Sequence, residues 1–178
     1  MKKRIIFLSC LIIILASFSG FMILRIVQTK KQNNVVAITK QTLPNFAFYS
    51  LDSIATGNDF ITKGKPVCIF YFNSDCEHCQ YEAKEINNNI TLFKNAQIVM
   101  VSFNTIKEIK QFQKEYNLNY PNITFLQDPK HEFKNWFGKT SIPSVFIYNA
   151  KHKLVKEYQG ETKINAIVKS LSSSSPLQ

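Results

Sequence analysis

The sequence predicts an α/β domain in which a mixed β-sheet is flanked by helices and follows an apolar N-terminal segment. Strand-like and helix-like segments alternate along most of the chain, which is typical of layered α/β folds. Residues 67–72 are apolar at every position, as expected for a central strand that is covered on both faces. The last two strand-like segments, 144–148 and 153–159, are joined by a short turn, which predicts a final antiparallel hairpin.

The N-terminal segment predicts a transmembrane helix that anchors the chain. Three basic residues precede the uncharged run Ile5–Leu24, and a helix of about twenty residues spans about 30 Å, enough to cross a bilayer core. Positive charge before such a run keeps the N-terminus in the cytoplasm, so the rest of the chain is expected outside. A cleaved signal sequence is the alternative, because residues 16–20 include small ones, but its apolar core is normally only about 7–15 residues long.

Length and charge limit the classes of protein to which the chain can belong. With 178 residues, 45% of them hydrophobic, the chain can form one packed domain plus an appendage. Four basic residues of 1–27 account for part of the net charge of +10, which leaves +6 on the remainder. These charges are interleaved with acids, so no nucleic-acid partner is expected. The predicted division is an anchor or signal sequence over 1–27, a polar tether over 28–42, the folded domain over 43–171 and a disordered tail over 172–178.

The elements of the domain follow from composition, spacing and turn residues. Further strands are predicted over 43–51, 97–103 and 123–126, and turn residues fill 52–58. Helices are predicted from the cysteines near residue 76 to about Asn95, and over 105–116 and 161–171. Asp128 and Pro129 predict the start of another helix, with proline at the first helical position, and Gly138 predicts its end.

Two cysteines, Cys76 and Cys79, directly follow the apolar strand and begin a predicted helix. Cys76 lies at the helix N-terminus, where unpaired N–H groups and the helix dipole favour a thiolate. Cys79 lies one turn further on, in the apolar stripe that also contains Ala83 and Ile86. An exposed, activated sulfur beside a shielded one is what reversible disulfide exchange requires. The sequence therefore predicts a redox-active Cys76–Cys79 pair.

The same spacing occurs in metal sites and in structural disulfides, and these remain alternatives. Zinc needs two further ligands, and neither Cys10, in the apolar run, nor Cys68, in the strand, belongs to a second ligand pair. We therefore expect no metal site and no cofactor. A carrier of a soft ion such as Cu(I), using the same two cysteines, is the alternative function.

Four features, in this order, resemble the thioredoxin superfamily: the turn Lys63–Pro66, the apolar strand, the C-x-x-C pair and Ile142-Pro143 before a strand. With the anchor and the leading strand, the chain is most similar to membrane-tethered thiol–disulfide oxidoreductases of the TlpA/ResA type. The resemblance implies a thioredoxin-like fold and a single-pass protein of the bacterial cytoplasmic membrane, with the domain on the periplasmic, extracytoplasmic side. It also implies protein thiols and disulfides as substrates, with reduction favoured over oxidation, and a membrane electron donor and cytochrome apoproteins as partners.

The resemblance also assigns roles by position. Cys76 matches the attacking nucleophile and Cys79 the resolving thiol. Pro143 matches the cis-proline beside the disulfide, and Ile142 matches the residue whose backbone binds the substrate chain. Asn73 stands where peroxidases of this fold need a threonine, so a peroxidase is not predicted.

Three residues near the cysteines are predicted to modulate the site. Glu82 matches an acidic residue of the ResA type, and on a helix it lies about 60° from Cys79, at the margin of the apolar stripe. A carboxylate there can exchange a proton with the thiol, whereas the alternative is a solvated surface glutamate. His78 occupies the position of a histidine that helps to stabilise the thiolate in the oxidant DsbA. Glu77 opposes that stabilisation, so the redox direction is left open.

Overall fold

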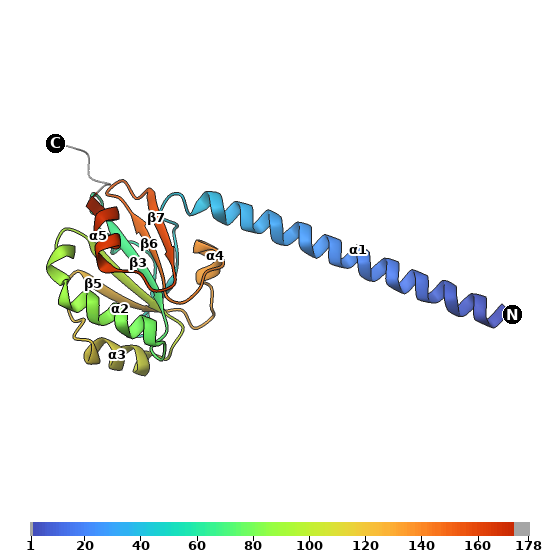
Figure 1. Ribbon diagram of the computed structural model, residues 1–178, viewed down its shortest axis with the longest axis horizontal. Helices are drawn as coiled ribbons and strands as arrows, with labels where there is room; N and C mark the ends of the chain where they lie inside the picture. The colour runs from blue at the N-terminus through green and yellow to red at the C-terminus, as the bar shows by residue number, and fades with distance from the viewer. Residues whose placement is uncertain (1, 173–178) are drawn as a thin grey trace. The chain divides into compact units, whose positions relative to one another are not determined.

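The structure, a computed structural model, describes residues 2–172 and divides the chain into two units, Met1–Ile38 and Thr39–Gln178 (Figure 1). Of the predicted anchor, the side chains of residues 2–14 and 16 lie outside the description, and so do residues 173–178 of the predicted tail. The first unit consists of the helix α1, Lys2–Thr39, which continues through most of the predicted tether. Among the described residues, no helix is both long and apolar enough to cross a membrane.

The second unit contains a mixed sheet of seven strands in the order β2-β1-β5-β4-β3-β6-β7. Parallel pairing joins β3 to β4 and β4 to β5, and the other neighbours are antiparallel. This arrangement confirms the predicted mixed sheet and places β7 at an edge. The strands are β1 (Phe48–Ser50), β2 (Ala55–Thr56), β3 (Val67–Phe72), β4 (Gln97–Ser102), β5 (Ile123–Gln127), β6 (Ser144–Tyr148) and β7 (Leu154–Gln159).

The central strands agree with the sequence prediction, but the first hairpin does not. The strand predicted over 43–51 is regular only at β1, and the predicted turn residues 52–58 include the short strand β2. The two strands pair around a turn in which Ser53 has a φ of 62° and Ser50 accepts its amide hydrogen. A strand of two residues leaves too short a period to be detected in the sequence.

The helices of the second unit are α2 (Glu77–Asn88), α3 (Ile106–Glu115), α4 (Phe133–Phe137) and α5 (Ile164–Ser172), with a 3₁₀ turn η1 (Ile90–Phe93) after α2. The helix predicted to start at Asp128 starts five residues later. The Asp128 carboxylate accepts the amide hydrogens of Glu132 and Phe133, and the left-handed backbone of His131, with φ 54°, prevents an earlier start. Gly138 ends α4, as predicted, with a φ of 86°.

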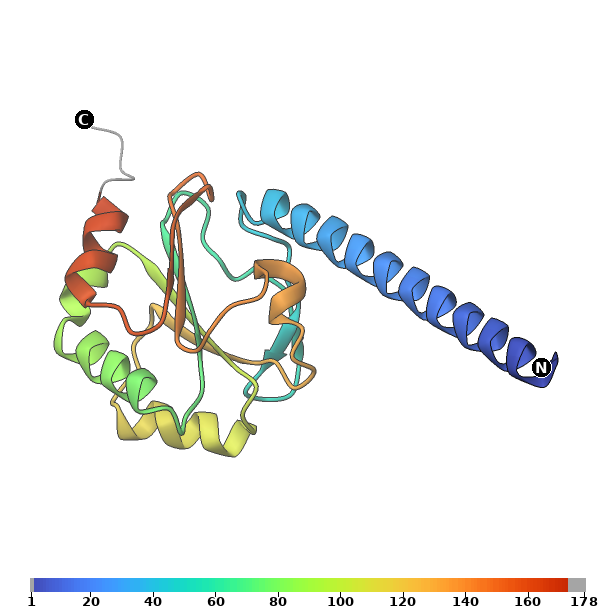
Figure 2. The same ribbon diagram turned by 45° about the vertical axis from the view of Figure 1, so that its right-hand side comes forward.

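The helices cover both faces of the sheet, with α2 and α5 on one side and α4 on the other (Figures 1 and 2). Alternate residues of β3 belong to two separate hydrophobic clusters. Phe70 and Phe72 pack with residues of α2, α3 and α5, whereas Ile69 and Tyr71 pack with residues of α4. Each fully buried side chain of this size contributes about 1.5–3 kcal/mol to folding. Burial on both faces fixes the end of β3, where the cysteines follow.

Candidate active site

The first cysteine lies where the chain passes from β3 into α2. Cys76 is the N-cap residue of α2, with φ −86° and ψ 116°, so its backbone is still extended while the next residue is helical. Its carbonyl oxygen accepts the amide hydrogen of Gln80 at 3.0 Å, which is the first hydrogen bond of the helix. The Cys76 side chain is partly exposed. The predicted placement at a helix N-terminus is therefore confirmed.

The buried side-chain amide of Asn104, two residues beyond the end of β4, holds the loop before Cys76. The Asn104 side-chain oxygen accepts the Ser74 amide hydrogen at 3.0 Å and the Ser102 hydroxyl hydrogen at 2.7 Å. Within the loop, the Asn73 carbonyl oxygen accepts the Cys76 amide hydrogen at 3.2 Å. The sequence interpretation missed Asn104. The sequence did contain a signal for Asn104, because it is a polar residue just beyond a buried strand. Since that strand runs parallel to β3, its carboxyl end lies at the same end of the sheet as the cysteine loop.

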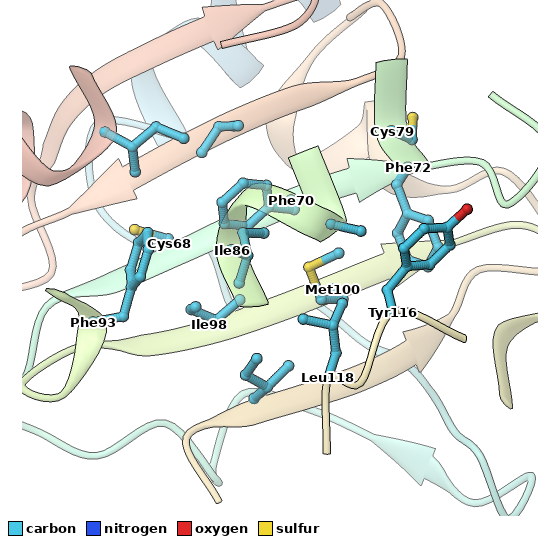
Figure 3. Packing of buried hydrophobic residues seen from close by; sticks show 14 of the residues in the cluster. Cys68, Phe70, Phe72, Cys79, Ile86, Phe93, Ile98, Met100, Tyr116 and Leu118 are labelled. Carbon is cyan, nitrogen blue, oxygen red and sulfur yellow. The ribbon is translucent and has the colours of Figure 1, made fainter. Parts of the chain in front are cut away.

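The second cysteine faces the core. Cys79 is 2% exposed and packs beside Phe72 at one end of the cluster under α2 (Figure 3). Burial raises the pKa of the Cys79 thiol far above the ordinary value, and the Cys76 sulfur and the Glu82 carboxylate add to this rise. A hydrogen bond from the backbone of Asn73 acts in the opposite direction and lowers the pKa. Both cysteines are free thiols here. The pair thus combines an accessible sulfur with one that gives up its proton only with help.

The third cysteine of this unit is remote from the pair. Cys68 is fully buried near the start of β3, beside Phe93, at the opposite end of the cluster from Cys79 (Figure 3). Phe72 lies four positions further along the strand, which corresponds to about 13 Å. Burial raises the pKa of its thiol far above the ordinary value. Cys68 is therefore a packing residue.

Glu82 lies one turn beyond Cys79 and is only 3% exposed. Its Oε1 accepts the Thr162 amide hydrogen at 2.7 Å. Burial is the main reason why the pKa of Glu82 is raised from 4.5 to about 7, and the charge of Glu161 adds to the rise. The hydrogen bond from Thr162 and the nearby His78 both act to lower the pKa. Glu82 is therefore no solvated surface glutamate. Its carboxyl group is present in both protonation states near neutral pH.

The Ile142–Pro143 peptide bond is cis and lies at the same end of the sheet as the cysteine loop, where β3 ends and β6 begins. In the pairing of β3 with β6, Tyr71 is opposite Ser144, so Pro143 lies beside the end of β3. Pro143 is buried and Ile142 is half-buried. The Pro143 carbonyl oxygen accepts the Gly160 amide hydrogen at 2.8 Å.

The two residues between the cysteines are exposed. The His78 Nδ1 lies 2.6 Å from Oε2 of Glu161, in the segment between β7 and α5. The sequence interpretation missed Glu161, because nothing in its local pattern distinguishes it from other surface acids. Glu85, which lies three residues after Glu82 in α2, is half-buried. Among the residues that the structure describes, no group of three or more His, Cys, Asp or Glu side chains could hold a metal ion.

The fold and the cysteine pair define a redox protein of the thioredoxin superfamily. The chain belongs to the AhpC/TSA family, which matches residues 39–157. It is similar to the thiol-disulfide oxidoreductase ResA of Bacillus thuringiensis subsp. konkukian (strain 97-27), with 26% identity over 164 residues and 90% of each chain covered. The ResA of Bacillus subtilis (strain 168) is 25% identical over 138 residues, which cover 67% of this chain and 75% of that protein.

Solved structures support the same fold. The structure of MTB dsbF in its mixed oxidized and reduced forms has a TM-score of 0.65 and 17% identity, and the match covers 77% of this chain and 98% of that one. A secreted Mycobacterium tuberculosis disulfide oxidoreductase homologous to E. coli DsbE has a TM-score of 0.62 and 16% identity, covering 72% of this chain and 96% of that one. At these identities the likeness establishes the fold alone.

Proposed function

We propose that the protein is a thiol–disulfide oxidoreductase that exchanges its Cys76–Cys79 dithiol with disulfides of protein substrates. The order of three side chains along α2 carries the proposal. Cys76 is partly exposed at the helix N-terminus, Cys79 is buried one turn later, and the carboxyl group of Glu82 is buried one turn after that. The relatives named ResA support the same activity.

The first step is nucleophilic attack by the exposed sulfur. The Cys76 thiolate attacks one sulfur of a substrate disulfide, so a mixed disulfide forms and the other substrate sulfur leaves as a thiolate. The helix N-terminus favours the negative charge on Cys76. Burial prevents Cys79 from competing for the substrate.

The second step needs a base, because Cys79 is protonated and buried. The Glu82 carboxylate takes the thiol proton, and the resulting Cys79 thiolate attacks the Cys76 sulfur. The Cys76–Cys79 disulfide forms, and the second substrate sulfur leaves, so two electrons have passed to the substrate. A pKa of about 7 lets Glu82 accept this proton and later return it, since the group is near half-ionised at neutral pH.

The substrate chain is proposed to lie along the edge formed by the cysteine loop and the cis-proline. The Ile142 backbone would bind the substrate main chain, and Pro143 would lie beside the disulfide. Glu77 and His78 would modulate the site through their charges, since both side chains are exposed next to the cysteines.

The domain is proposed to act on the extracytoplasmic side of a bacterial cytoplasmic membrane, held there by residues 5–27. The basic start and uncharged run of the sequence support this location. We further propose that the protein works as a reductase, with a membrane electron donor that restores the dithiol and cytochrome apoproteins among its substrates. The family resemblance is the support for these partners.

Insulin reduction tests the proposed activity against the copper-carrier alternative. The full-length protein, kept in solution with mild detergent, should accelerate the precipitation of insulin by dithiothreitol, and Cys76→Ser should return the rate to background. Cys68→Ala is the matched control and should remain active. Stoichiometric copper in the purified protein, found by mass spectrometry together with insulin reduction at background level, would overturn the proposal.

A further inference from the structure

A short segment between β7 and α5 contacts three separate parts of the candidate site. The Gly160 amide donates to the Pro143 carbonyl oxygen at 2.8 Å, and the Thr162 amide donates to Glu82 Oε1 at 2.7 Å. Between them, Glu161 Oε2 lies 2.6 Å from His78 Nδ1. Residues 160–162, here called the bridging segment, therefore join the cis-proline, the buried carboxyl group and the residue between the cysteines.

The bridging segment has the geometry of a turn whose shape fixes the direction of the Thr162 amide. Gly160 has a φ of 82°, a left-handed conformation that favours glycine, and its carbonyl oxygen accepts the Thr162 hydroxyl hydrogen at 3.0 Å. Thr162 is buried, whereas the Glu161 side chain is 40% exposed and that of His78 is 69% exposed. The contact between Glu161 and His78 thus lies at the surface, whereas the next residue, Thr162, donates a buried hydrogen bond to Glu82.

We propose that Glu161 is a positioning residue, which through its hydrogen bond with His78 holds the bridging segment against the first turn of α2 and keeps the Thr162 amide on the Glu82 carboxylate. The inference rests on the proposed function in treating Glu82 as the group that exchanges protons with Cys79. Glu161 touches neither sulfur in this arrangement and acts only through the segment that it holds.

The pair also acts on Glu82 through its charges, in two opposite directions. The Glu161 carboxylate raises the Glu82 pKa, and His78 lowers it. Cys79, on the same helix, also interacts with Glu82, because the Glu82 charge raises the pKa of the Cys79 thiol. Two other charged groups are Glu85 of α2 and Lys163, just before α5. Together with Tyr81 they line a different surface pocket, of about 170 Å³.

Three variants separate positioning from charge. Glu161→Gln removes the charge but keeps an oxygen that can accept the His78 N–H. Glu161→Ala and His78→Ala remove the tie altogether. If the Glu161–His78 hydrogen bond positions the bridging segment, both alanine variants should speed hydrogen exchange of the Thr162 amide about fivefold, which corresponds to the usual net contribution of one hydrogen bond. Glu161→Gln should leave that rate near the wild-type value.

The charges predict a second and independent signature. Glu161→Gln removes repulsion and should lower the titration midpoint of Glu82 by about 0.5–1 pH unit. His78→Ala removes attraction and weakens the Thr162 hydrogen bond, so it should raise that midpoint by a similar amount. Glu85→Gln is the matched control on the same helix, and it should leave the midpoint unchanged.

Both signatures can be measured by NMR on the full-length reduced protein in detergent, with ¹³C-labelled glutamate and with the Glu82 signal assigned from Glu82→Gln. We expect the Thr162 amide to exchange faster in both alanine variants and at the wild-type rate in Glu161→Gln. We also expect the titration midpoint of Glu82 to fall in Glu161→Gln and to rise in His78→Ala. The inference would be overturned if Thr162 exchange stayed unchanged in the alanine variants, or if the Glu82 midpoint moved in the same direction in Glu161→Gln and His78→Ala. If the signatures appear but Glu82→Gln leaves thiol exchange unaffected, the bridging segment still positions Glu82, and only the proton-transfer role in the proposed function fails.

Discussion

Replacement of Glu82 by glutamine should make the reduced protein more stable above neutral pH while it slows thiol exchange. Glutamine has nearly the same size, and its side-chain oxygen can accept the Thr162 amide hydrogen as Glu82 does. What changes is the charge. The wild-type protein must ionise a carboxyl group that is only 3% exposed, and the variant never does.

The sign and size of the effect follow from the raised pKa. Because folding raises the Glu82 pKa from 4.5 to about 7, the folded state binds its proton more tightly than the unfolded state. The stability from this group is complete below about pH 4.5 and is lost as the pH rises through 7. About 2.5 pH units, at about 1.36 kcal/mol each, give a loss of about 3.4 kcal/mol. The glutamine NH₂ group, if unpaired, costs about 1 kcal/mol, so the variant should gain about 2 kcal/mol at pH 8.

Urea unfolding, followed by the fluorescence of the single tryptophan Trp136, measures this difference. With a reductant present, the variant should be slightly less stable than the wild type at pH 4 and about 2 kcal/mol more stable at pH 8, with the two curves crossing between about pH 5 and 6. Exchange activity at pH 7 should fall about 10²-fold, the usual loss on removal of a general base. Glu85→Gln should alter neither quantity. A stability difference that stays constant across this pH range would show that Glu82 does not titrate with a raised pKa.

Three further predictions concern the cysteines and the topology. Cys76 should react with iodoacetamide about tenfold or more faster than Cys79 near neutral pH, because burial protects Cys79 and raises its thiol pKa; equal rates by mass spectrometry would contradict the assigned roles. Cys68→Ala should reduce the free energy of unfolding by about 1–2 kcal/mol and leave exchange intact; a loss of activity at unchanged stability would contradict its role in packing. Alkaline phosphatase fused after Gln178 should be active in cells if Ile5–Leu24 exports the domain, and an inactive fusion would contradict the proposed location.

The sequence predicted the central part of the fold because its signals there are local and strong. Val67–Phe72 is apolar throughout, and both its bounds and its burial on two faces are confirmed. The capping box of α3, in which Thr105 and Glu108 bond each other's backbone, places the start of that helix where the apolar spacing predicts it. The late start of α4 could not be predicted, because it depends on a long turn closed by Asp128.

The candidate site divides in the same way. The positions of Cys76, Cys79 and Glu82 follow from helix spacing, which is local. The contacts of Asn104 and Glu161 depend on which segments the fold brings beside α2 from far along the chain. No period or motif records such contacts, so they had to come from the structure.

Trapping of the mixed disulfide tests whether Cys76 attacks substrate disulfides and Cys79 resolves the product. When Cys79→Ser is mixed with an oxidised protein substrate such as insulin, a stable covalent adduct through Cys76 should form, identified by mass spectrometry of the linked peptides. Cys76→Ser should give none, because Cys79, the other thiol of the pair, is buried and protonated. An adduct that forms through Cys79 in Cys76→Ser, or none in either variant, would contradict these roles of the two cysteines.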